Sequence, residues 1–221
     1  MIVLAVPVKD LVTAKQRLAR VLTAEQRRAL ARAMLGDVLR AAADARVAHV
    51  WVVTREPETA ALARALGADT LAEADNRGHT EAVAAAQAAA RGAGARVFAT
   101  IPGDVPCVTG DEIRALVQAA DDAPSVAFVP SRSGLGTNGA ALAPPDAMPL
   151  RFGEPSFDNH LAAARARSLT PRVLRLPGLG LDVDGPEDVG ALRVAGPDTE
   201  SGRLVAAWTL DHRLLAAAAT R

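Results

Sequence analysis

Short runs of apolar residues alternate along the chain with longer segments in which apolar residues recur every three or four positions. Unbroken short runs are typical of buried strands, and the longer spacing is typical of amphipathic helices. The pattern predicts strands at residues 2–7, 49–53, 69–72, 97–102 and 126–129. Because these strands are apolar at nearly every position, we expect a mostly parallel sheet that is covered on both faces.

Two of the intervening helices have a well-marked start. Thr23 and Thr109 are followed three residues later by Gln26 and Glu112, which is the spacing of a capping box. Helices are therefore predicted from these threonines to about residues 45 and 120. The positions of proline, glycine and apolar residues predict further helices at residues 57–67, 80–90, 156–168, from 186 onward, and 198–221.

The pattern becomes less regular after residue 129. A polar, glycine-rich loop at 131–138 precedes an apolar stretch at 139–142, which predicts a strand that returns antiparallel to its neighbour. A further strand is predicted at 173–176, and residues 181–184 read as a short strand or an extended segment. We therefore predict an α/β fold of three layers, α/β/α, with a mixed, mostly parallel sheet and a β-hairpin insertion.

Composition excludes several classes of protein. The 221 residues are 50% hydrophobic and carry 25 basic and 25 acidic side chains, so no net field favours nucleic acid. A single cysteine, Cys107, excludes a disulfide framework and a cysteine-rich zinc site. No apolar run approaches the ~18 residues of a membrane span. We expect a soluble, cytoplasmic protein with one domain at 1–196 and a helical extension at 197–221, whose apolar stripe packs on the domain or forms a homodimer contact.

Lysine is confined to one segment near the N-terminus. Lys9 and Lys15 are the only lysines, and every other basic residue is an arginine. Both follow the first predicted strand, at the edge where open α/β sheets bind ligands. Because lysine is a compact charge on a flexible stem, it suits a phosphate that moves during a reaction. The alternative is that both are ordinary solvated lysines.

Three aspartates are candidates for a metal site. Asp104 follows the strand predicted at 97–102, and Asp182 and Asp184 lie two apart in an extended segment, so that they project from one face. Such carboxylates repel each other unless a cation lies between them, and Mg²⁺ prefers one or two carboxylates together with phosphate oxygens. The alternatives are a turn role for Asp104 and a helix cap for Asp184.

Three glycine-containing loops can present backbone amides to an anion. The loop at 134–139 adds Thr137 and Asn138 as hydrogen-bonding side chains, and a plain hairpin turn is the alternative. The loop that ends at Ser156 and the loop that contains Gly78 each lead into a predicted helix. The N-terminus of a helix attracts anions, so both loops are candidates for phosphate binding.

Other chemistries lack their motifs. His79 and His160 have no metal-ligand spacing and are expected to be polar or supporting residues, and Cys107 has no evident paired base. The chain contains neither a Gly-x-x-x-x-Gly-Lys phosphate loop nor a Gly-x-Gly-x-x-Gly turn after the first strand. A P-loop ATPase and a nicotinamide-dependent dehydrogenase are therefore not expected.

Taken together, five segments resemble a known family. In chain order they are Pro7-Val8-Lys9 with Ala14-Lys15-Gln16-Arg17-Leu18, Pro102-Gly103-Asp104-Val105-Pro106, Gly136-Thr137-Asn138, Phe152-Gly153-Glu154-Pro155-Ser156 and Leu181-Asp182-Val183-Asp184-Gly185-Pro186. They resemble the 2-phospho-L-lactate or phosphoenolpyruvate guanylyltransferases of deazaflavin coenzyme (F-420) biosynthesis, over about residues 3–192. The tail after about Gly196 has no counterpart that we can place. The resemblance implies a single-domain, Rossmann-like nucleotidyltransferase fold.

The resemblance also implies an activity, its substrates and its site. GMP would pass from GTP to a small three-carbon phosphate, which could be phosphoenolpyruvate, 2-phospho-L-lactate or 3-phosphoglycerate, and pyrophosphate would leave. A downstream transferase of the same pathway is an implied partner. The implied site residues are Asp104, Asp182 and Asp184 for Mg²⁺; Thr137, Gly153 and Ser156 for the acceptor phosphoester; and Lys9, Lys15, Arg17 and Gly78 for the nucleotide, with Lys15 and Asp104 central to catalysis.

Two other functions remain open from the sequence. One is a nucleotidyltransferase for another acceptor, such as a sugar phosphate or the molybdenum cofactor, which would keep the first loop and the carboxylates. The other is a non-catalytic nucleotide-binding module. The three retained carboxylates argue against a module that only binds.

Overall fold

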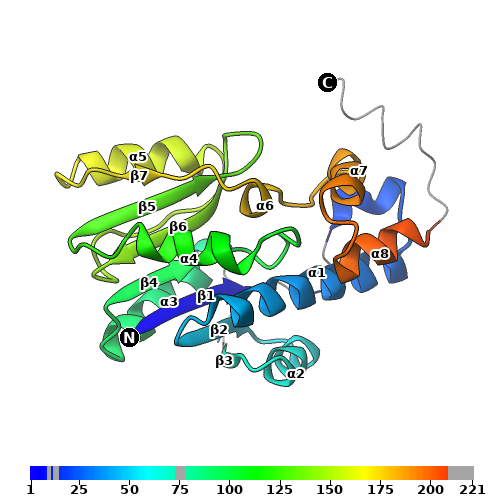
Figure 1. The fold of residues 1–221 in the computed structure, drawn as a ribbon, viewed down its shortest axis with the longest axis horizontal. Helices are drawn as coiled ribbons and strands as arrows, with labels where there is room; N and C mark the ends of the chain where they lie inside the picture. Colours follow the sequence, from blue (N-terminus) through cyan, green and yellow to red (C-terminus); the bar gives the residue numbers. More distant parts are fainter. Residues whose placement is uncertain (9–10, 12–14, 73–77, 209–221) are drawn as a thin grey trace.

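The computed structural model describes residues 1–8, 11, 15–72 and 78–208. Its described strands form one sheet of seven, in the order β3-β2-β1-β4-β6-β5-β7 (Figure 1). The strands are β1 (Ile2–Pro7), β2 (His49–Thr54), β3 (Asp69–Ala72), β4 (Val97–Thr100), β5 (Ser125–Pro130), β6 (Thr137–Ala143) and β7 (Arg172–Val173). The five strands predicted before residue 130 are all present.

One strand of this sheet runs against the others. β1 pairs in parallel with β2 and β4, β2 with β3, and β5 with β7, whereas β6 pairs antiparallel with both β4 and β5. The β5–β6 hairpin is therefore inserted into an otherwise parallel sheet. This confirms the predicted mixed sheet with a hairpin insertion.

Helices cover both faces of the sheet, which confirms the three layers. One face packs against α1 (Ala24–Ala45), α2 (Pro57–Ala65) and α4 (Gly110–Gln118), and the other packs against α3 (His79–Gly92) and α5 (Ser156–Arg165) (Figure 1). The remaining helical elements are the 3-10 helix η1 (Gln16–Arg20), α6 (Pro177–Gly180), α7 (Pro186–Ala195) and α8 (Glu200–Ala206). Apolar clusters on the two faces of the sheet form its two main cores, and a third lies between η1, α1, α7 and α8.

Both predicted capping boxes are formed. The backbone N–H of Gln26 donates to the hydroxyl of Thr23 and that of Glu112 to the hydroxyl of Thr109, while the glutamine and glutamate side chains accept from the threonine amides. These bonds satisfy amides that the first turn of a helix otherwise leaves without partners. They fix the starts of α1 and α4 at the predicted residues.

Two predicted elements are wrong in extent. The strand predicted at 173–176 is reduced to Arg172–Val173. The short helix α6 begins at Pro177, directly after the predicted strand would have ended. Residues 181–184 form an extended segment that pairs with no strand among those described, which is one of the two alternatives predicted for them. The final helix, predicted at 198–221, ends at Ala206. Beyond it, the amide of Trp208 donates to the carbonyl of Val205, and the indole packs on the third core. Residues 209–221 lie outside the described residues.

The described part of the predicted extension is anchored to α1 by one buried aspartate. The carboxylate of Asp37 accepts hydrogen bonds from the backbone amides of Glu200 and Ser201, at 2.8 and 2.9 Å, and from the Ser201 hydroxyl at 2.6 Å. Asp37 is 7% exposed and also pairs with Arg40. The first turn of α8 is thus held to the middle of α1.

Replacing Asp37 with alanine is expected to destabilise the protein by about 1–3 kcal/mol, because buried amide donors lose their acceptor. The free energy of unfolding from urea denaturation measures this. Asp44→Ala, on the exposed face of the same helix, is the matched control and is expected to change it by less than about 0.5 kcal/mol. Equal stabilities of the two variants would contradict the anchoring role.

Candidate active site

A cavity of about 580 Å³ opens where β1, β4 and β5 end. Pro7 and Val8 close the end of β1, Asp104 follows β4, and Ser131 follows β5. The carboxyl ends of parallel strands meet at one edge of a sheet, which is where open α/β folds bind ligands. The volume lies in the range of small-molecule sites.

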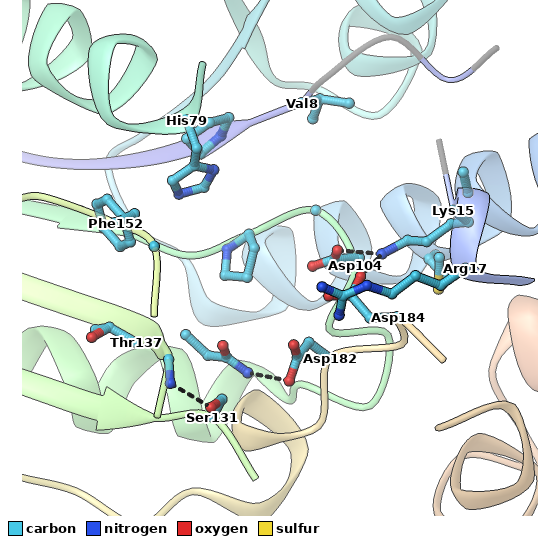
Figure 2. A pocket seen from close by; sticks show the side chains of 18 of the residues that line it. Val8, Lys15, Arg17, His79, Asp104, Ser131, Thr137, Phe152, Asp182 and Asp184 are labelled. Atoms are coloured by element: carbon cyan, nitrogen blue, oxygen red, sulfur yellow. Dashed lines mark hydrogen bonds and ion pairs between the residues drawn. The ribbon is translucent and has the colours of Figure 1, made fainter. Parts of the chain in front are cut away.

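An ion cluster occupies one end of this cavity. The Lys15 ammonium nitrogen lies 2.5 Å from Asp104 Oδ2 and 2.8 Å from Asp184 Oδ1, and only 8% of its side chain is exposed. Figure 2 shows Lys15, Arg17, Asp104 and Asp184 gathered at the same end. The lysine bridges two segments separated by 80 residues of sequence, so it is not an ordinary solvated lysine.

The protonation state and the backbone of Lys15 are both constrained. Burial by itself would lower the pKa of this amine, but the charges of Asp104 and Asp184 and their hydrogen bonds outweigh burial and raise it above its usual range. Lys15 is thus a permanent cation. Its backbone has φ of 58° and ψ of 41°, a left-handed conformation that costs a non-glycine residue of order 1 kcal/mol. Strain of this kind is often found at functional sites.

The third carboxylate is held by an amide. Asp182 Oδ1 accepts a hydrogen bond of 3.0 Å from Asn138 Nδ2, whose amide group also bonds to the carbonyls of Leu179 and Gly180. Burial raises the pKa of Asp182, the Asn138 hydrogen bond lowers it, and the negative charges of Asp104 and Asp184 raise it again, with a net increase. The Asp182 carboxylate therefore lies close enough to Asp104 and Asp184 for their negative charges to disfavour its ionisation.

The N-cap residue of α7 is Gly185 rather than Asp184. The amides of Asp184 and Gly185 both donate to Asp188 Oδ2, at 3.0 and 2.8 Å. Asp188 thus caps α7 from within the helix, and the Asp184 carboxylate is turned toward Lys15. Asp104 likewise uses its carboxylate for Lys15, while its backbone carbonyl accepts the amide of Val183 at 3.1 Å and ties the two acidic segments together.

Thr137 lies toward the other end of the cavity (Figure 2), which is also lined by Ser156 and Gly153. The Ser156 hydroxyl donates to Thr137 Oγ1 at 3.2 Å, so the first residues of β6 and α5 are in direct contact. Gly153 has φ of 113°, a backbone conformation that only glycine adopts easily, and it is exposed at the rim. The glycine-rich loop is a hairpin turn and also lines the cavity, so the two readings of it are compatible.

The structure brings most of the predicted site residues together. The predicted residues that line the cavity are Lys15, Arg17, Asp104, Thr137, Gly153, Ser156, Asp182 and Asp184. Gly78 is not among the lining residues, although its neighbour His79 is. Gly78 precedes α3 with φ of 109°, which gives it a backbone role. Lys9 lies outside the described residues, so its role stays a prediction.

Some lining residues were not found from the sequence. Ala31, Met34 and Leu35 of α1 form an apolar wall. Phe152 and His79, which belong to two loops already singled out in the sequence, also line the cavity and meet edge to face, with ring centroids 4.5 Å apart. Alanine, methionine and leucine carry no signal that separates a cavity wall from a core. His79 is part of the Gly78 loop, and the sequence predicts only a polar or supporting role for it.

The acidic end contains three carboxylates, which are the type of ligand that Mg²⁺ prefers. Among the described residues, no group of three or more histidine, cysteine, aspartate or glutamate side chains is arranged to hold a metal ion by itself. The Lys15 ammonium instead sits between Asp104 and Asp184. One ammonium cannot neutralise three carboxylates, and Mg²⁺ needs only one or two of them when phosphate oxygens supply further ligands. The donor set therefore fits Mg²⁺ bound together with a nucleotide.

Comparison with known proteins places the sequence in a family. The profile of the family described as "Guanylyl transferase CofC like" matches residues 1–214, which extends beyond Gly196, where the tail had no counterpart from the sequence. A phosphoenolpyruvate guanylyltransferase of Roseiflexus sp. (strain RS-1) is 40% identical over 90% of this chain and 88% of its own. One of Sphaerobacter thermophilus is 40% identical over 89% of this chain and 97% of its own.

Solved structures agree on the fold. A protein of Desulfovibrio desulfuricans G20 superposes with a TM-score of 0.75 at 17% identity, covering 93% of each chain. A nucleotidyl transferase of Methanothermobacter superposes with a TM-score of 0.66 at 15% identity, covering 88% of this chain and 96% of its own. The predicted nucleotidyltransferase fold is confirmed. No helix among the described residues is long and apolar enough to cross a membrane.

Proposed function

The chain belongs to the CofC-like guanylyl transferases, and from this premise we propose that it transfers GMP from GTP to phosphoenolpyruvate or a closely similar three-carbon phosphate. The supporting observation is a cavity with two unlike ends, one built from an ammonium and three carboxylates and the other from hydroxyls and a glycine loop. Such a cavity suits two phosphorylated substrates that must meet. The pathway would be deazaflavin coenzyme biosynthesis.

In the proposed reaction a phosphate oxygen of the acceptor attacks the α-phosphorus of GTP. The bond between the α- and β-phosphates breaks, its electron pair leaves with pyrophosphate, and a diphosphate diester remains. The attacking phosphate is already ionised at neutral pH, because its second pKa is near 6. No general base is required, and a permanently charged Lys15 could not serve as one.

Catalysis would then consist of alignment and charge neutralisation. Lys15 and Arg17 would bind the triphosphate. Thr137 and Gly153 would bind the acceptor phosphoester together with the backbone amide of Ser156, because the Ser156 hydroxyl hydrogen is already donated to Thr137. Asp104, Asp182 and Asp184 would hold Mg²⁺, which supplies positive charge to the phosphates when bound. The hydrogen bond from Asn138 to Oδ1 orients the Asp182 carboxylate at the wall of the cavity.

Pyrophosphate release over a matrix of four nucleoside triphosphates and several acceptors tests this function. The expected result is release with GTP and phosphoenolpyruvate, 2-phospho-L-lactate or 3-phosphoglycerate, and little with sugar phosphates. Release with a sugar phosphate alone would favour the other acceptor class. Nucleotide binding without any release would favour a module that only binds.

The cavity is expected to have two half-sites, the Lys15 end for GTP and the Thr137 end for the acceptor. Thermal denaturation should distinguish ligand binding at one from ligand binding at the other. At about 100 times its dissociation constant, phosphoenolpyruvate adds about 2.7 kcal/mol, or roughly 5–10 °C in a domain of this size. Thr137→Ala and Ser156→Ala should each reduce that shift and leave the GTP-induced shift intact, because the nucleotide contacts are assigned to the Lys15 end.

Thr170→Ala is the matched control, since Thr170 is exposed and lies outside the cavity lining. If Thr137→Ala and Ser156→Ala abolish the GTP shift and spare the phosphoenolpyruvate shift, the two half-sites are reversed. If no three-carbon phosphate shifts the wild-type protein with GTP present or absent, the proposed acceptor is wrong.

A further inference from the structure

A buried histidine stands directly behind the hydroxyl groups of the cavity. His160 lies on α5 one turn after Ser156, and it is 2% exposed. Its ring stacks on Phe128 at a centroid distance of 5.3 Å and meets the edge of Phe152 at the same distance. Two aromatic rings thus fix the plane of the imidazole, so that its nitrogens point in set directions.

The hydrogen bonds of His160 determine which nitrogen carries the proton. Nε2 accepts the backbone N–H of Arg151 at 2.9 Å, and an amide N–H can only donate. The ring hydrogen must therefore be on Nδ1, which lies 3.0 Å from Thr137 Oγ1. Burial lowers the pKa of His160 to about 4, which keeps the ring neutral at neutral pH. The Nδ1–H group accordingly donates to the threonine hydroxyl.

Thr137 Oγ1 then accepts two hydrogen bonds. One comes from His160 Nδ1, and the other, of 3.2 Å, comes from the Ser156 hydroxyl. A hydroxyl has two acceptor lone pairs and one donor hydrogen. With both lone pairs engaged, only the hydrogen of Thr137 is left for a ligand in the cavity that this residue lines. The threonine can donate to a ligand there but cannot accept from one.

We propose that His160 is a positioning residue that makes the Thr137 hydroxyl an obligate donor to the acceptor phosphate. The inference rests on the proposed function and deepens it. An ionised phosphate is rich in acceptor oxygens, so a donor-only hydroxyl recognises it, whereas a hydroxyl free to rotate serves donors and acceptors alike. The device selects an ionised phosphoester over a neutral hydroxylated ligand. His160 touches no substrate itself and acts through Thr137.

The tautomer is the first test, and it requires no turnover. A long-range ¹H–¹⁵N correlation spectrum at neutral pH distinguishes the two imidazole nitrogens, and the signals missing from His160→Asn identify this residue among the four histidines. The expected result is a neutral ring protonated on Nδ1. A ring protonated on Nε2, or a cationic ring, would overturn the proposal.

Binding of phosphoenolpyruvate is the second test, measured by calorimetry with GTP affinity in parallel. His160→Phe keeps the ring between Phe128 and Phe152 but removes both nitrogens, and it should weaken phosphoenolpyruvate binding about tenfold or more. His160→Asn can place an amide N–H near the former Nδ1 and should recover most of that loss. Both should leave GTP affinity within about twofold, and melting temperatures confirm that each variant folds.

A double-mutant cycle separates positioning from a merely structural role. If His160 acts through Thr137, then His160→Phe should cause little further loss of phosphoenolpyruvate affinity in a Thr137→Val background. The same loss in both backgrounds would overturn the proposal. A wild-type protein with the Nδ1–H tautomer that binds no three-carbon phosphate would instead overturn the proposed function, which distinguishes the two failures.

Discussion

Replacing Asp104 or Asp182 with asparagine is expected to lower guanylyl transfer at least about a hundredfold, while the protein stays folded. Loss of a carboxylate that holds the cation among the phosphates removes several kcal/mol of transition-state stabilisation, and each factor of ten corresponds to about 1.4 kcal/mol. Asparagine keeps the size of the side chain and removes its charge. The measurement is pyrophosphate release with saturating GTP and phosphoenolpyruvate.

The structure explains why these substitutions should spare the fold. In Asp104→Asn the Lys15 ammonium keeps Asp184 as a charged partner, at 2.8 Å. In Asp182→Asn the amide of Asn138 keeps its bonds to the carbonyls of Leu179 and Gly180. The melting temperatures of both variants should therefore fall only slightly, whereas their turnover numbers should fall at least about a hundredfold.

Asp122→Asn is the matched control, because the Asp122 side chain is 86% exposed and pairs only with the exposed Arg172 among its described contacts. Its activity should equal that of the wild type. A chelator should abolish activity in the wild type, and Mg²⁺ or Mn²⁺ should restore it. Full activity in the presence of chelator, or in Asp104→Asn, would remove the metal from the proposed reaction.

The strands around the site were largely predictable from the sequence, although their order in the sheet was not predicted. Buried parallel strands are apolar at nearly every position, so the runs at β1, β2 and β4 stood out, and the carboxyl-end rule then placed Asp104 in the cavity. Asp182 and Asp184 were placed by their spacing alone, since residues two apart in an extended segment share a face. Both predictions depend only on residues that are close in sequence, so they do not require knowledge of the tertiary structure.

The contacts between distant segments were not predictable. Nothing near Lys15 in sequence indicates that its ammonium lies between Asp104 and Asp184, because that contact depends on the path of a loop and on the position of α7. Nor could the role of His160 be derived, although its spacing of four residues from Ser156 places both on one face of a helix. The missing information was which residue of β6 faces them.

The end of the last helix shows a different limit. Apolar residues at helical spacing continue past Ala206, so periodicity alone extends the helix. The helix nevertheless ends at Ala206, and the Trp208 indole packs on a core that includes Leu30, Val183 and Val189. Tertiary packing outweighs local propensity where the two disagree.

Replacing Lys15 with methionine is expected to impair GTP turnover and, at the same time, to strengthen Mn²⁺ binding. In Lys15→Met the side chain keeps its length but loses its charge, so the GTP Michaelis constant should rise or turnover should fall by at least about tenfold. Binding of Mn²⁺ without nucleotide should become tighter, because the ammonium that competes for Asp104 and Asp184 is gone. The two changes together distinguish a phosphate-binding lysine from one that only neutralises the carboxylates.

Lys15→Arg is expected to recover only part of the activity, because a planar guanidinium cannot take the place of a compact ammonium 2.5 and 2.8 Å from two carboxylates. Arg20→Ala is the matched control, since Arg20 is exposed on η1 and lies outside the cavity lining. Calorimetric Mn²⁺ titration and steady-state kinetics on the same samples provide both readouts. Tighter Mn²⁺ binding with unchanged kinetics in Lys15→Met would mean that Lys15 only balances the negative charges of Asp104 and Asp184. Binding of the GTP phosphates would then be assigned to Arg17 and its neighbours.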